Sequence, residues 1–392
     1  MKILLLGVGM QGKVALYDLV RSPSVTEIIA ADMDVAKLRS HVDAHGWGHK
    51  VRCQPVDGAD PASLDRLMAM KPDVAIDLLP AVFIPNVARA AIERGVHLVN
   101  SNYLPAELRA LGDTARARGV TVLPEFGLDP GLDLVMLGDA SRALDVIEEI
   151  HSYGSGIPEL AAANNPLRYK VSWTFEGVLK AYRRPARAIR DGVLIDIDRT
   201  QVFAPENVRI EEVAGLGALE VYPNGDAVAY AADLGLDPAS LRAAGRYTMR
   251  WPGHCAFWKT IVDLHLLDLE PVVVDGAPVD RLRYLAAALG PHLQYAPGER
   301  DVAIVIVEVI GRKDRQRKRL RYTLVDLLDP ATGFSAMSRT VGFTTSIAAQ
   351  MIASGKITQR GLLSPINDVP YAAVADELGK RGVKIVFEAS TA

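Results

Sequence analysis

The chain has 392 residues, 49% of them hydrophobic and 23% charged, which is typical of a globular protein with a large core and is too long for one ordinary domain. It carries 44 Lys and Arg against 47 Asp and Glu, a formal net charge of −3, so no overall electrostatic attraction draws it to nucleic acid or to an anionic membrane. Only two cysteines are present, which excludes a disulfide scaffold and a cysteine-rich zinc site.

The first 130 residues alternate short apolar runs with amphipathic segments. The apolar runs predict the strands Lys2–Leu6, Glu27–Ala31, Val51–Val56, Asp73–Leu79, His97–Asn100 and Val120–Leu123. The amphipathic segments predict the helices Gln11–Val20, Val35–His45, Pro61–Met70, Pro85–Arg94 and Pro105–Arg118. Because a connection between parallel strands needs a segment of this length, and because apolar strands suit a sheet covered on both faces, we expect an α/β domain with a parallel sheet.

Beyond residue 131 the pattern changes. A helix predicted over Leu132–Leu144 is followed by strand-like segments separated by Gly and Pro turns, which favours an α+β domain with a mixed, largely antiparallel sheet. These strands are predicted at Glu149–Tyr153, Val193–Asp198, Ala218–Val221, Tyr247–Trp251, Asp301–Val309 and Leu320–Leu327. The last stretch, Ser346–Ser354 and then Lys384–Phe387, is predicted as a helix and a strand that pack back onto the first domain.

A basic run at residues 312–321 lies between two of the predicted strands and has no interleaved aromatic residue. We interpret it as a solvated hairpin tip and expect no nucleic-acid partner. No apolar run approaches the roughly 20 residues of a membrane-spanning helix, and the N-terminus lacks the long apolar region of a secretory signal. We therefore expect a cytoplasmic protein with no membrane partner.

A glycine-rich motif, Gly7-x-Gly9-x-x-Gly12, directly follows the first predicted strand and opens the first predicted helix. In a βαβ unit the first glycine allows a tight turn, the second lets the backbone approach a pyrophosphate, and the third allows close packing of helix and strand. The free N–H groups at the start of the helix would then receive the phosphates. The motif predicts a Rossmann dinucleotide-binding domain, and the alternative is a glycine-rich turn without a ligand.

Asp32 ends the second predicted strand, twenty positions after Gly12, where a carboxylate accepts hydrogen bonds from both ribose hydroxyls and repels the 2′-phosphate of NADP. Because Met33 follows it in place of an arginine, we expect NAD as the cofactor ahead of NADP. Ligands of open α/β sheets bind at the carboxyl ends of the strands. The remaining predicted cofactor-binding residues are Val8, Met10, Gln11, Asp57, Gly58, Leu79, Pro80, Ser101 and Asn102.

Three histidines at helical spacing, His41, His45 and His49, suggest a metal site. Glycines interrupt that helix, however, and glycine disfavours helical conformation. We therefore interpret the three histidines as an exposed helix end and expect no metal.

Several segments carry motifs more specific than the glycine-rich loop. Residues 152–158 are Ser-Tyr-Gly-Ser-Gly-Ile-Pro, residues 165–173 are Asn-Pro-Leu-Arg-Tyr-Lys-Val-Ser-Trp, and residues 222–226 are Tyr-Pro-Asn-Gly-Asp. Together with residues 123–131, 336–342 and 355–365, these segments resemble the saccharopine dehydrogenase family over essentially the whole chain. The resemblance implies a Rossmann domain, an inserted catalytic and dimerisation domain, and a C-terminal return to the first domain.

We accordingly expect an NAD-binding domain formed by residues 1–130 and 346–392, and a substrate-binding and dimerisation domain formed by residues 131–345, assembled as a homodimer or a higher homo-oligomer. The resemblance also implies an NAD-dependent oxidoreductase that acts on a C–N bond of a small amino-acid or opine-like substrate. The favoured reaction is glutamate-forming oxidation of saccharopine, which also releases 2-aminoadipate 6-semialdehyde, or its reverse.

Two alternatives remain open. Lysine 6-dehydrogenase activity, the oxidative ε-deamination of lysine, is one, because the run Arg250–His254 resembles that enzyme. The remoter one is an inactive dinucleotide-binding regulatory protein, because the family's motif cysteine and arginine are Gly154 and Gly225 here. Since arginine is a natural bidentate partner of a carboxylate, its loss at position 225 weakens or relocates recognition of the glutamyl arm.

Both oxidations transfer a hydride from a carbon that bears nitrogen and then add water to an imine, so they need groups that transfer protons. Our candidates are Tyr103 and Asp129 near the strand ends, and His254 as a second-domain base that faces the cleft. The structural alternatives are wall packing for Tyr103, a turn or helix cap for Asp129 and a loop position for His254. The predicted substrate-binding residues are Tyr103, Glu125, Lys170, Trp173, Asn224 and Arg250.

Overall fold

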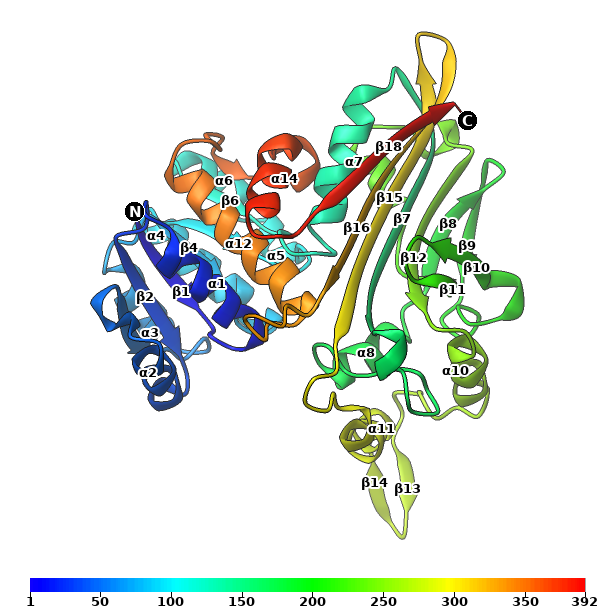
Figure 1. Cartoon of the computed structure of the whole chain (residues 1–392), viewed down its shortest axis with the longest axis horizontal. Coiled ribbons are helices and arrows are strands. Elements are labelled where there is room, and N and C mark those ends of the chain that lie inside the picture. Colours follow the sequence, from blue (N-terminus) through cyan, green and yellow to red (C-terminus); the bar gives the residue numbers. More distant parts are fainter. Residues whose placement is uncertain (392) are drawn as a thin grey trace. The chain divides into compact units, whose positions relative to one another are not determined.

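The computed structural model describes residues 1–391 and divides the chain into two compact units (Figure 1). Unit 1 comprises Met1–Asp139 and Ser338–Lys384, and unit 2 comprises Ala140–Met337 together with the segment that begins at Ile385. Unit 1 therefore extends nine residues further than the expected boundary at residue 130, and its second stretch begins eight residues before the expected residue 346.

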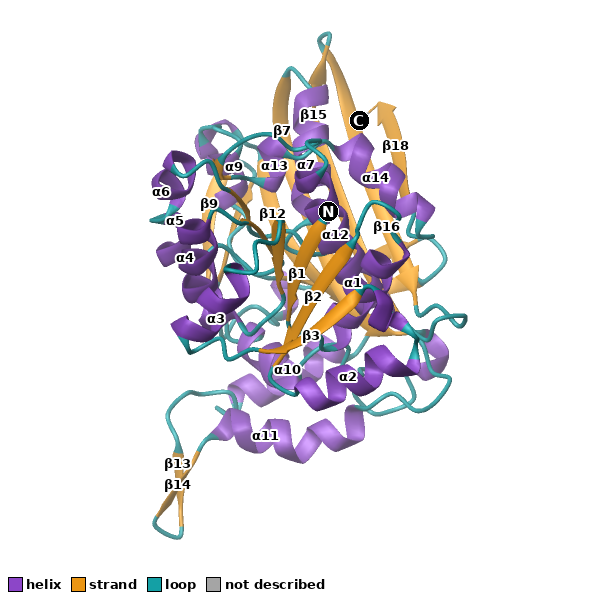
Figure 2. Ribbon diagram, turned by 90° about the vertical axis from the view of Figure 1, so that its left-hand side faces the viewer, coloured by secondary structure: helices purple, strands orange, loops and turns teal. Residues whose placement is uncertain are grey.

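A parallel seven-stranded sheet forms the centre of unit 1. Its strands are β1 (Lys2–Leu6), β2 (Glu27–Asp32), β3 (Val51–Pro55), β4 (Val74–Asp77), β5 (His97–Asn100), β6 (Thr121–Leu123) and β17 (Gly361–Leu362). They lie in the order β17-β6-β5-β4-β1-β2-β3, and Figure 2 shows β1, β2 and β3 side by side. Because the strand order changes direction at β1, this is the doubly wound Rossmann arrangement, and that prediction is confirmed.

The helices of the first stretch of unit 1 connect successive strands, and those of the second stretch follow the insertion. They are α1 (Met10–Arg21), α2 (Val35–Ala44), α3 (Pro61–Met68), α4 (Ile84–Arg94), α5 (Ala106–Arg109), α6 (Gly112–Ala117), α7 (Leu132–Ala143), α12 (Ala336–Ala353), α13 (Pro365–Asp368) and α14 (Tyr371–Lys380). The single helix expected over Pro105–Arg118 is two short helices. Gly112 begins the second, and a Cβ there would lie only 3.2 Å from the Leu362 side chain of β17.

A mixed nine-stranded sheet forms unit 2. Its strands are β7 (Val146–Pro158), β8 (Ala186–Arg190), β9 (Val193–Ile197), β10 (Arg209–Val213), β11 (Gly217–Pro223), β12 (Ala243–Arg250), β15 (Asp301–Lys313), β16 (Gln316–Leu327) and β18 (Ile385–Thr391). The main order is β10-β11-β12-β7-β15-β16-β18, with β8 and β9 at the side. Only the β12–β7 pair is parallel among these described strands, so the prediction of a largely antiparallel sheet is confirmed.

The remaining elements of unit 2 are helices and one small hairpin. They are α8 (Phe175–Ala181), α9 (Ala229–Asp233), α10 (His254–Asp263) and α11 (Arg281–Leu289), with the hairpin of β13 (Val272–Val274) and β14 (Ala277–Val279), which projects beyond α11 in Figure 1. Over residues 1–391 no helix is both long and apolar enough to cross a membrane.

The last strand, β18, lies in a different domain from the one predicted. Lys384–Phe387 was expected to return to the first domain, but β18 pairs antiparallel with β16 in the sheet of unit 2. The rings of Phe387 and Tyr322 lie 4.7 Å apart across this pair. Pairing with β18 covers a strand edge of β16 that would otherwise present unpaired backbone groups, which is the physical reason for the different placement.

The basic run is the tip of the β15–β16 hairpin, which turns at Asp314 and Arg315 with φ values of 51° and 64°. Arg312 and Arg317 both form ion pairs with Glu148 of β7, at 2.6 and 3.0 Å. Carboxylates of the neighbouring strand therefore balance part of the positive charge that the sequence concentrates in this run.

Candidate functional site

The glycine-rich loop between β1 and α1 is shaped by close backbone contacts. Gly7 has a φ of +84°, and a Cβ there would lie 2.7 Å from the carbonyl oxygen of Leu78. A Cβ at Gly12 would lie 2.0 Å from the carbonyl oxygen of Gly7, so only glycine lets α1 begin this close to β1. A Cβ at Gly9, by contrast, would have no atom within 4 Å. The loop therefore has open space at the glycine expected to face a pyrophosphate, and α1 has no side-chain cap.

A pocket of about 290 Å³ lies beside this loop. Its lining consists of Val8, Gly9, Met10, Lys13, Asp32, Asp34, Lys37, Leu38 and His41. The Asp32 carboxylate accepts hydrogen bonds from the backbone N–H groups of Val8 (2.8 Å) and Asp34 (3.0 Å). It therefore ties the end of β2 to the glycine-rich loop, while Lys13 and Lys37 bring two ammonium groups to the same pocket.

Of the three histidines considered as a metal site, His41 and His45 lie at the end of α2 and His49 lies in the short 3-10 helix Trp47–His49 that follows. The rings of His41 and His45 are 4.5 Å apart, and the His45 ring stacks on Trp47 at 4.5 Å. Burial, His45 and Lys13 all lower the pKa of His41. Among the described residues, no three His, Cys, Asp or Glu side chains gather in an arrangement that could hold a metal ion.

Two buried polar side chains end β4 and β5 at the carboxyl edge of the sheet. Asp77 accepts hydrogen bonds from the Leu79 N–H (3.1 Å) and from Nδ2 of Asn100 (2.8 Å), and Oδ1 of Asn100 accepts one from the Asn102 N–H (2.7 Å). Burial raises the pKa of Asp77 to about 6. These bonds hold the loops that carry the predicted residues Leu79, Pro80, Ser101 and Asn102. Sequence reasoning missed Asp77 and Asn100, although a lone polar residue inside the apolar run 74–79 and one at the end of the run 97–100 are the signals that mark them.

Asp57 and Gly58 form a turn after β3. The Asp57 carboxylate accepts a hydrogen bond from the Ala59 N–H at 2.9 Å, within the turn itself. The Gly58 carbonyl oxygen accepts one from Nδ2 of Asn86 (3.3 Å), and a Cβ at Gly58 would lie 2.7 Å from the Phe83 ring. This turn therefore packs against the start of α4.

Two neighbouring loops at the carboxyl edge carry the predicted proton-transfer residues of unit 1. Tyr103, with 44% of its surface exposed, lies in the loop after β5, and Glu125 and Asp129 lie in the loop after β6. Glu125 joins the loops: its N–H donates to the Asn102 carbonyl oxygen (3.0 Å), and its Oε1 accepts from the Leu104 N–H (3.2 Å). The structure therefore places Tyr103 and Glu125 on adjoining loops, with Asp129 further along the second.

One face of β12 carries polar residues. Arg246, Thr248 and Arg250 share this face because alternate residues of a strand point to the same side, whereas Tyr247 and Met249 on the other face belong to a buried hydrophobic cluster. The strand predicted at Tyr247–Trp251 contained only Thr248 and Arg250 of this face, because β12 begins earlier, at Ala243. Sequence reasoning singled out only Arg250.

Arg246 lies beside the position at which the resemblance expects an arginine. Nδ2 of Asn224 donates to Oγ1 of Thr248 (2.8 Å), and Nη1 of Arg246 donates to the Asn224 carbonyl oxygen (2.8 Å). A Cβ at Gly225, where φ is +80°, would lie 3.1 Å from that same Nη1. The guanidinium of Arg246 on β12 therefore lies close to position 225, where the family has an arginine and this chain has a glycine.

Lys170 and Trp173 lie in the segment 163–174, which contains neither helix nor strand. Lys170 is buried and forms an ion pair with Glu299, whose pKa it lowers, together with further hydrogen bonds, to about 2. Trp173 is 41% exposed. The charge of Lys170 is therefore matched inside unit 2, whereas the Trp173 indole is accessible.

His254, predicted as a base of the second domain, is a buried residue of unit 2. It is 2% exposed and begins α10 directly after Gly253, where φ is +98°. Its Nε2 lies 2.8 Å from the Tyr182 hydroxyl, and its ring packs against Tyr169 and Tyr182. Burial and then the Arg250 charge hold the pKa of His254 well below its usual range, so the imidazole is neutral and packed within the core of unit 2.

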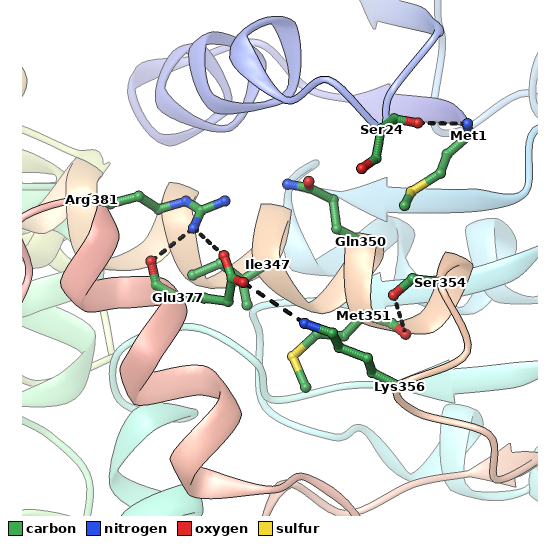
Figure 3. Close-up of a pocket in the computed structure, with 9 residues that line it drawn as sticks. All are labelled: Met1, Ser24, Ile347, Gln350, Met351, Ser354, Lys356, Glu377 and Arg381. Carbon is green, nitrogen blue, oxygen red and sulfur yellow. Dashed lines mark hydrogen bonds and ion pairs between the residues drawn. The ribbon is translucent and has the colours of Figure 1, made fainter.

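A second pocket of unit 1, of about 170 Å³, lies at the amino edge of the sheet (Figure 3). Its lining consists of Met1, Ser24, Ile347, Gln350, Met351, Ser354, Lys356, Glu377 and Arg381. Arg381 pairs with Glu377 at 2.8 Å, and Lys356 approaches the same carboxylate at 3.8 Å. Since these charges are matched to one another and ligands of such sheets bind at the opposite edge, we assign no ligand to this pocket.

Two family models match the chain almost from end to end. The model described as saccharopine dehydrogenase NADP binding domain matches residues 3–123, and the one described as saccharopine dehydrogenase C-terminal domain matches residues 127–383. A solved structure of apo histidine-tagged saccharopine dehydrogenase (L-Glu forming) from Saccharomyces cerevisiae superposes with a TM-score of 0.87 at 24% identity, with both chains fully covered. This likeness shows that the fold is shared.

Curated relatives carry the same family name or that of a longer enzyme. Alpha-aminoadipic semialdehyde synthase, mitochondrial, from Bos taurus is 28% identical over 97% of this chain and 47% of its own length. Saccharopine dehydrogenase (NADP(+), L-glutamate-forming) from Saccharomyces cerevisiae is 28% identical over 83% of this chain and 86% of its own. The chain therefore spans about half the length of the first of these relatives.

These comparisons correct the expected cofactor. The preference for NAD over NADP is wrong, because the matching domain model is described as NADP binding and the fungal relatives carry NADP(+) in their names. The expectation rested on the Asp32 carboxylate and on Met33, whereas the pocket beside Asp32 is also lined by two lysines. Lys13 and Lys37 in the adjoining pocket supply positive charge that suits a 2′-phosphate.

Proposed function

The chain belongs to the saccharopine dehydrogenase family, and from this membership we propose that it is an NADP-dependent oxidoreductase that acts on a CH–NH donor. The proposed reaction is the oxidation of saccharopine to glutamate and 2-aminoadipate 6-semialdehyde, or its reverse. The observation that carries the proposal is that the two family models, NADP-binding and C-terminal, match the chain in succession. The names of the fungal relatives support the same substrate.

The residues of unit 1 fit a dinucleotide that carries a 2′-phosphate. The open space at Gly9 and the uncapped start of α1 suit the pyrophosphate, and Lys13 and Lys37 suit the 2′-phosphate. When bound, the nicotinamide supplies the hydride acceptor for the carbon next to nitrogen.

Asp129 and Tyr103 are the proposed proton-transfer residues. The substrate amine must be neutral before its carbon loses a hydride, and the water that attacks the imine must lose a proton, so a carboxylate base serves both needs. We assign that base to Asp129 and a hydrogen bond from the hydroxyl to the reacting nitrogen to Tyr103. Glu125 links the loop after β6 to the loop after β5 through its hydrogen bonds to Asn102 and Leu104. His254 has no part in this scheme, because its Nε2 already lies against the Tyr182 hydroxyl and its ring packs against Tyr169 and Tyr182.

The test is an assay of reduced nicotinamide formation with saccharopine and with lysine, each with NADP and with NAD. We expect turnover with saccharopine and NADP and at least tenfold less with every other pair. Turnover with lysine alone would establish the ε-deaminating alternative. No turnover with either amine, combined with measurable NADPH binding, would instead favour a regulatory dinucleotide-binding protein.

Asp129→Asn is expected to lower kcat with saccharopine by 100-fold or more, because an amide cannot accept the proton. NADPH affinity, measured by fluorescence titration, should stay within twofold of wild type. Asp113→Asn is the matched control, since that carboxylate is 96% exposed on α6. A near-normal kcat for Asp129→Asn would reduce Asp129 to a turn residue.

A further inference from the structure

Arg250, the last residue of β12, buries its guanidinium without a carboxylate partner. The residue is 6% exposed. Its Nη1 donates to Oγ of Ser155 (3.0 Å) and to the Met249 carbonyl oxygen (2.8 Å), and its Nε has no hydrogen-bond partner. Within residues 1–391 it forms no ion pair with an aspartate or a glutamate. A buried charge is costly unless an opposite charge compensates it, so this arrangement calls for an anion.

The acidic side chains of the region are committed to other donors. Asp301 accepts from the first two N–H groups of α12, at 2.7 and 3.0 Å. Glu299 forms its ion pair with Lys170. Glu220, the register partner of Arg250 on β11, accepts from two N–H groups at the start of α10, both at 2.8 Å. None of these three carboxylates compensates the guanidinium.

Two phenol hydroxyls without acceptors share its surroundings. The Arg250 guanidinium lies 5.1 Å from the centre of the buried Tyr169 ring. The hydroxyls of Tyr169 and Tyr295 are both buried and have no hydrogen-bond partner, and Tyr295 interacts electrostatically with both Tyr169 and Arg250. Burial raises the pKa of both phenols, so they stay protonated and act as donors.

Hydrogen bonds within its loop fix the position of Tyr169. Asn165 accepts hydrogen bonds from the N–H groups of Leu167 (3.1 Å) and Tyr169 (3.3 Å), and it donates to the Tyr169 carbonyl oxygen (2.7 Å). Asn165 therefore bonds to both the N–H and the carbonyl oxygen of Tyr169 and fixes the backbone that carries this side chain. Arg250, Tyr169 and Tyr295 therefore offer three donors, one of them cationic, in a region of low exposure.

We propose that Arg250, Tyr169 and Tyr295 bind a carboxylate group of the amino-acid substrate inside unit 2. A carboxylate supplies the missing negative charge, and its two oxygens accept several hydrogen bonds, which suits one N–H and two O–H donors. That the carboxylate belongs to the substrate rests on the proposed function, whereas the carboxylate site itself does not.

The test uses glutarate as the probe, with binding measured by isothermal titration calorimetry and by the shift in unfolding temperature. Wild type is expected to bind glutarate saturably. Arg250→Met should weaken binding at least 100-fold, and Tyr169→Phe, which removes one hydroxyl and keeps the ring, should weaken it about tenfold. Without glutarate, both variants should unfold at or above the wild-type temperature, because neither removes a compensated group.

Arg209→Met is the matched control. Its guanidinium lies 4.0 Å from the Tyr247 ring and already donates to the Tyr153 hydroxyl (2.8 Å), so its loss should leave glutarate binding unchanged. Wild-type glutarate affinity in Arg250→Met contradicts the proposal. So does equal stabilisation of wild type by sodium chloride at the same ionic strength, or the absence of saturable binding.

Saccharopine turnover separates the two proposals. A wild-type protein that binds glutarate through Arg250 but oxidises no saccharopine refutes the proposed reaction and supports the carboxylate site. A wild-type protein that oxidises saccharopine, with the same KM in Arg250→Met, refutes the carboxylate site and supports the reaction.

Discussion

At the scale of single residues, Asp77 connects the end of β4 to the loops at the carboxyl edge of the sheet of unit 1. It is fully buried, and its carboxylate accepts hydrogen bonds from Leu79 and Asn100, the residues that begin or support the loops at the strand ends. A carboxyl group in such surroundings is disfavoured in its charged form, which is why burial raises the pKa of Asp77 to about 6. The residue therefore couples the stability of unit 1 to pH.

Asp77→Asn should remove that coupling. Between pH 6 and pH 4 the folded wild type binds a proton that the unfolded chain, with the ordinary pKa of about 3.8, does not bind. The wild-type free energy of unfolding should therefore rise relative to the variant as the pH falls from 7 to 4, by roughly 2 kcal/mol. Urea unfolding of both proteins across this range measures the difference. Parallel pH profiles would show that Asp77 titrates normally.

Lys37→Glu should change the choice of cofactor. Reversing the charge in the pocket beside Asp32 puts a carboxylate against the 2′-phosphate, so NADPH affinity should fall at least tenfold while NADH affinity stays within twofold. Fluorescence titration with both nucleotides measures this ratio. Lys37→Arg keeps the charge and should bind NADPH as wild type does. Equal losses for both nucleotides would place Lys37 outside the 2′-phosphate site.

At the scale of elements, one buried aspartate joins three helices of unit 1. Asp18 of α1 accepts hydrogen bonds from Ser346 (2.6 Å) and Gln350 (3.2 Å) of α12, and it pairs with Arg381 just beyond α14 (2.6 Å). A Cβ at Gly342 would lie 2.6 Å from the Gln11 carbonyl oxygen, so α12 approaches the α1 backbone closely. The C-terminal helices are thereby attached to the helix that opens the cofactor loop.

Asp18→Ala should destabilise unit 1 by about 1–3 kcal/mol, because it removes the acceptor of the buried Ser346 hydroxyl and one of the two carboxylates that pair with Arg381. Urea unfolding followed by circular dichroism measures the loss. Asp18→Asn, which keeps part of the hydrogen bonding, should lose clearly less. A loss below about 0.5 kcal/mol for Asp18→Ala would mean that the helices are held by apolar packing alone.

At the scale of the whole molecule, the chain passes between its units three times. It leaves unit 1 after Asp139, returns at Ser338 and leaves again after Lys384 to add β18 to the sheet of unit 2. The buried residues Tyr322 and Leu324 of β16 lie opposite β18 in that sheet. Of the residues after the insertion, Ser338–Lys384 therefore contribute to the stability of unit 1, and β18 contributes to that of unit 2.

Truncation after Lys384 should expose the β16 edge and promote association of unit 2, while NADPH binding by unit 1 survives. Light scattering and NADPH titration follow the two effects. Phe387→Ala, which keeps the strand and removes one ring, should change the scattering far less. An unchanged scattering profile after truncation would contradict the role given to β18. The same measurement on wild type tests the homodimer or higher oligomer, which stays a prediction.

The sequence by itself determined the features that depend on neighbours along the chain. Hydrophobic periodicity predicted the parallel βαβ succession and the β15–β16 hairpin, glycine spacing predicted the loop at Gly7, and local motifs predicted the family. Each of these follows from backbone geometry and side-chain pattern over a few residues. The Asp129 loop and the Tyr103 loop were placed at the carboxyl edge for the same reason.

Only the tertiary structure decided which polar groups are engaged and which are buried. Asp32 ends β2, but its hydrogen bonds to Val8 and Asp34 and the two lysines of the adjoining pocket depend on the fold. The burial of His254, the uncompensated charge of Arg250 and the pairing of β18 depend on residues far away in the sequence. Hydrogen bonds and burial are formed by groups that the fold brings together, as in the Asp18–Arg381 pair 363 residues apart, and no local pattern records them.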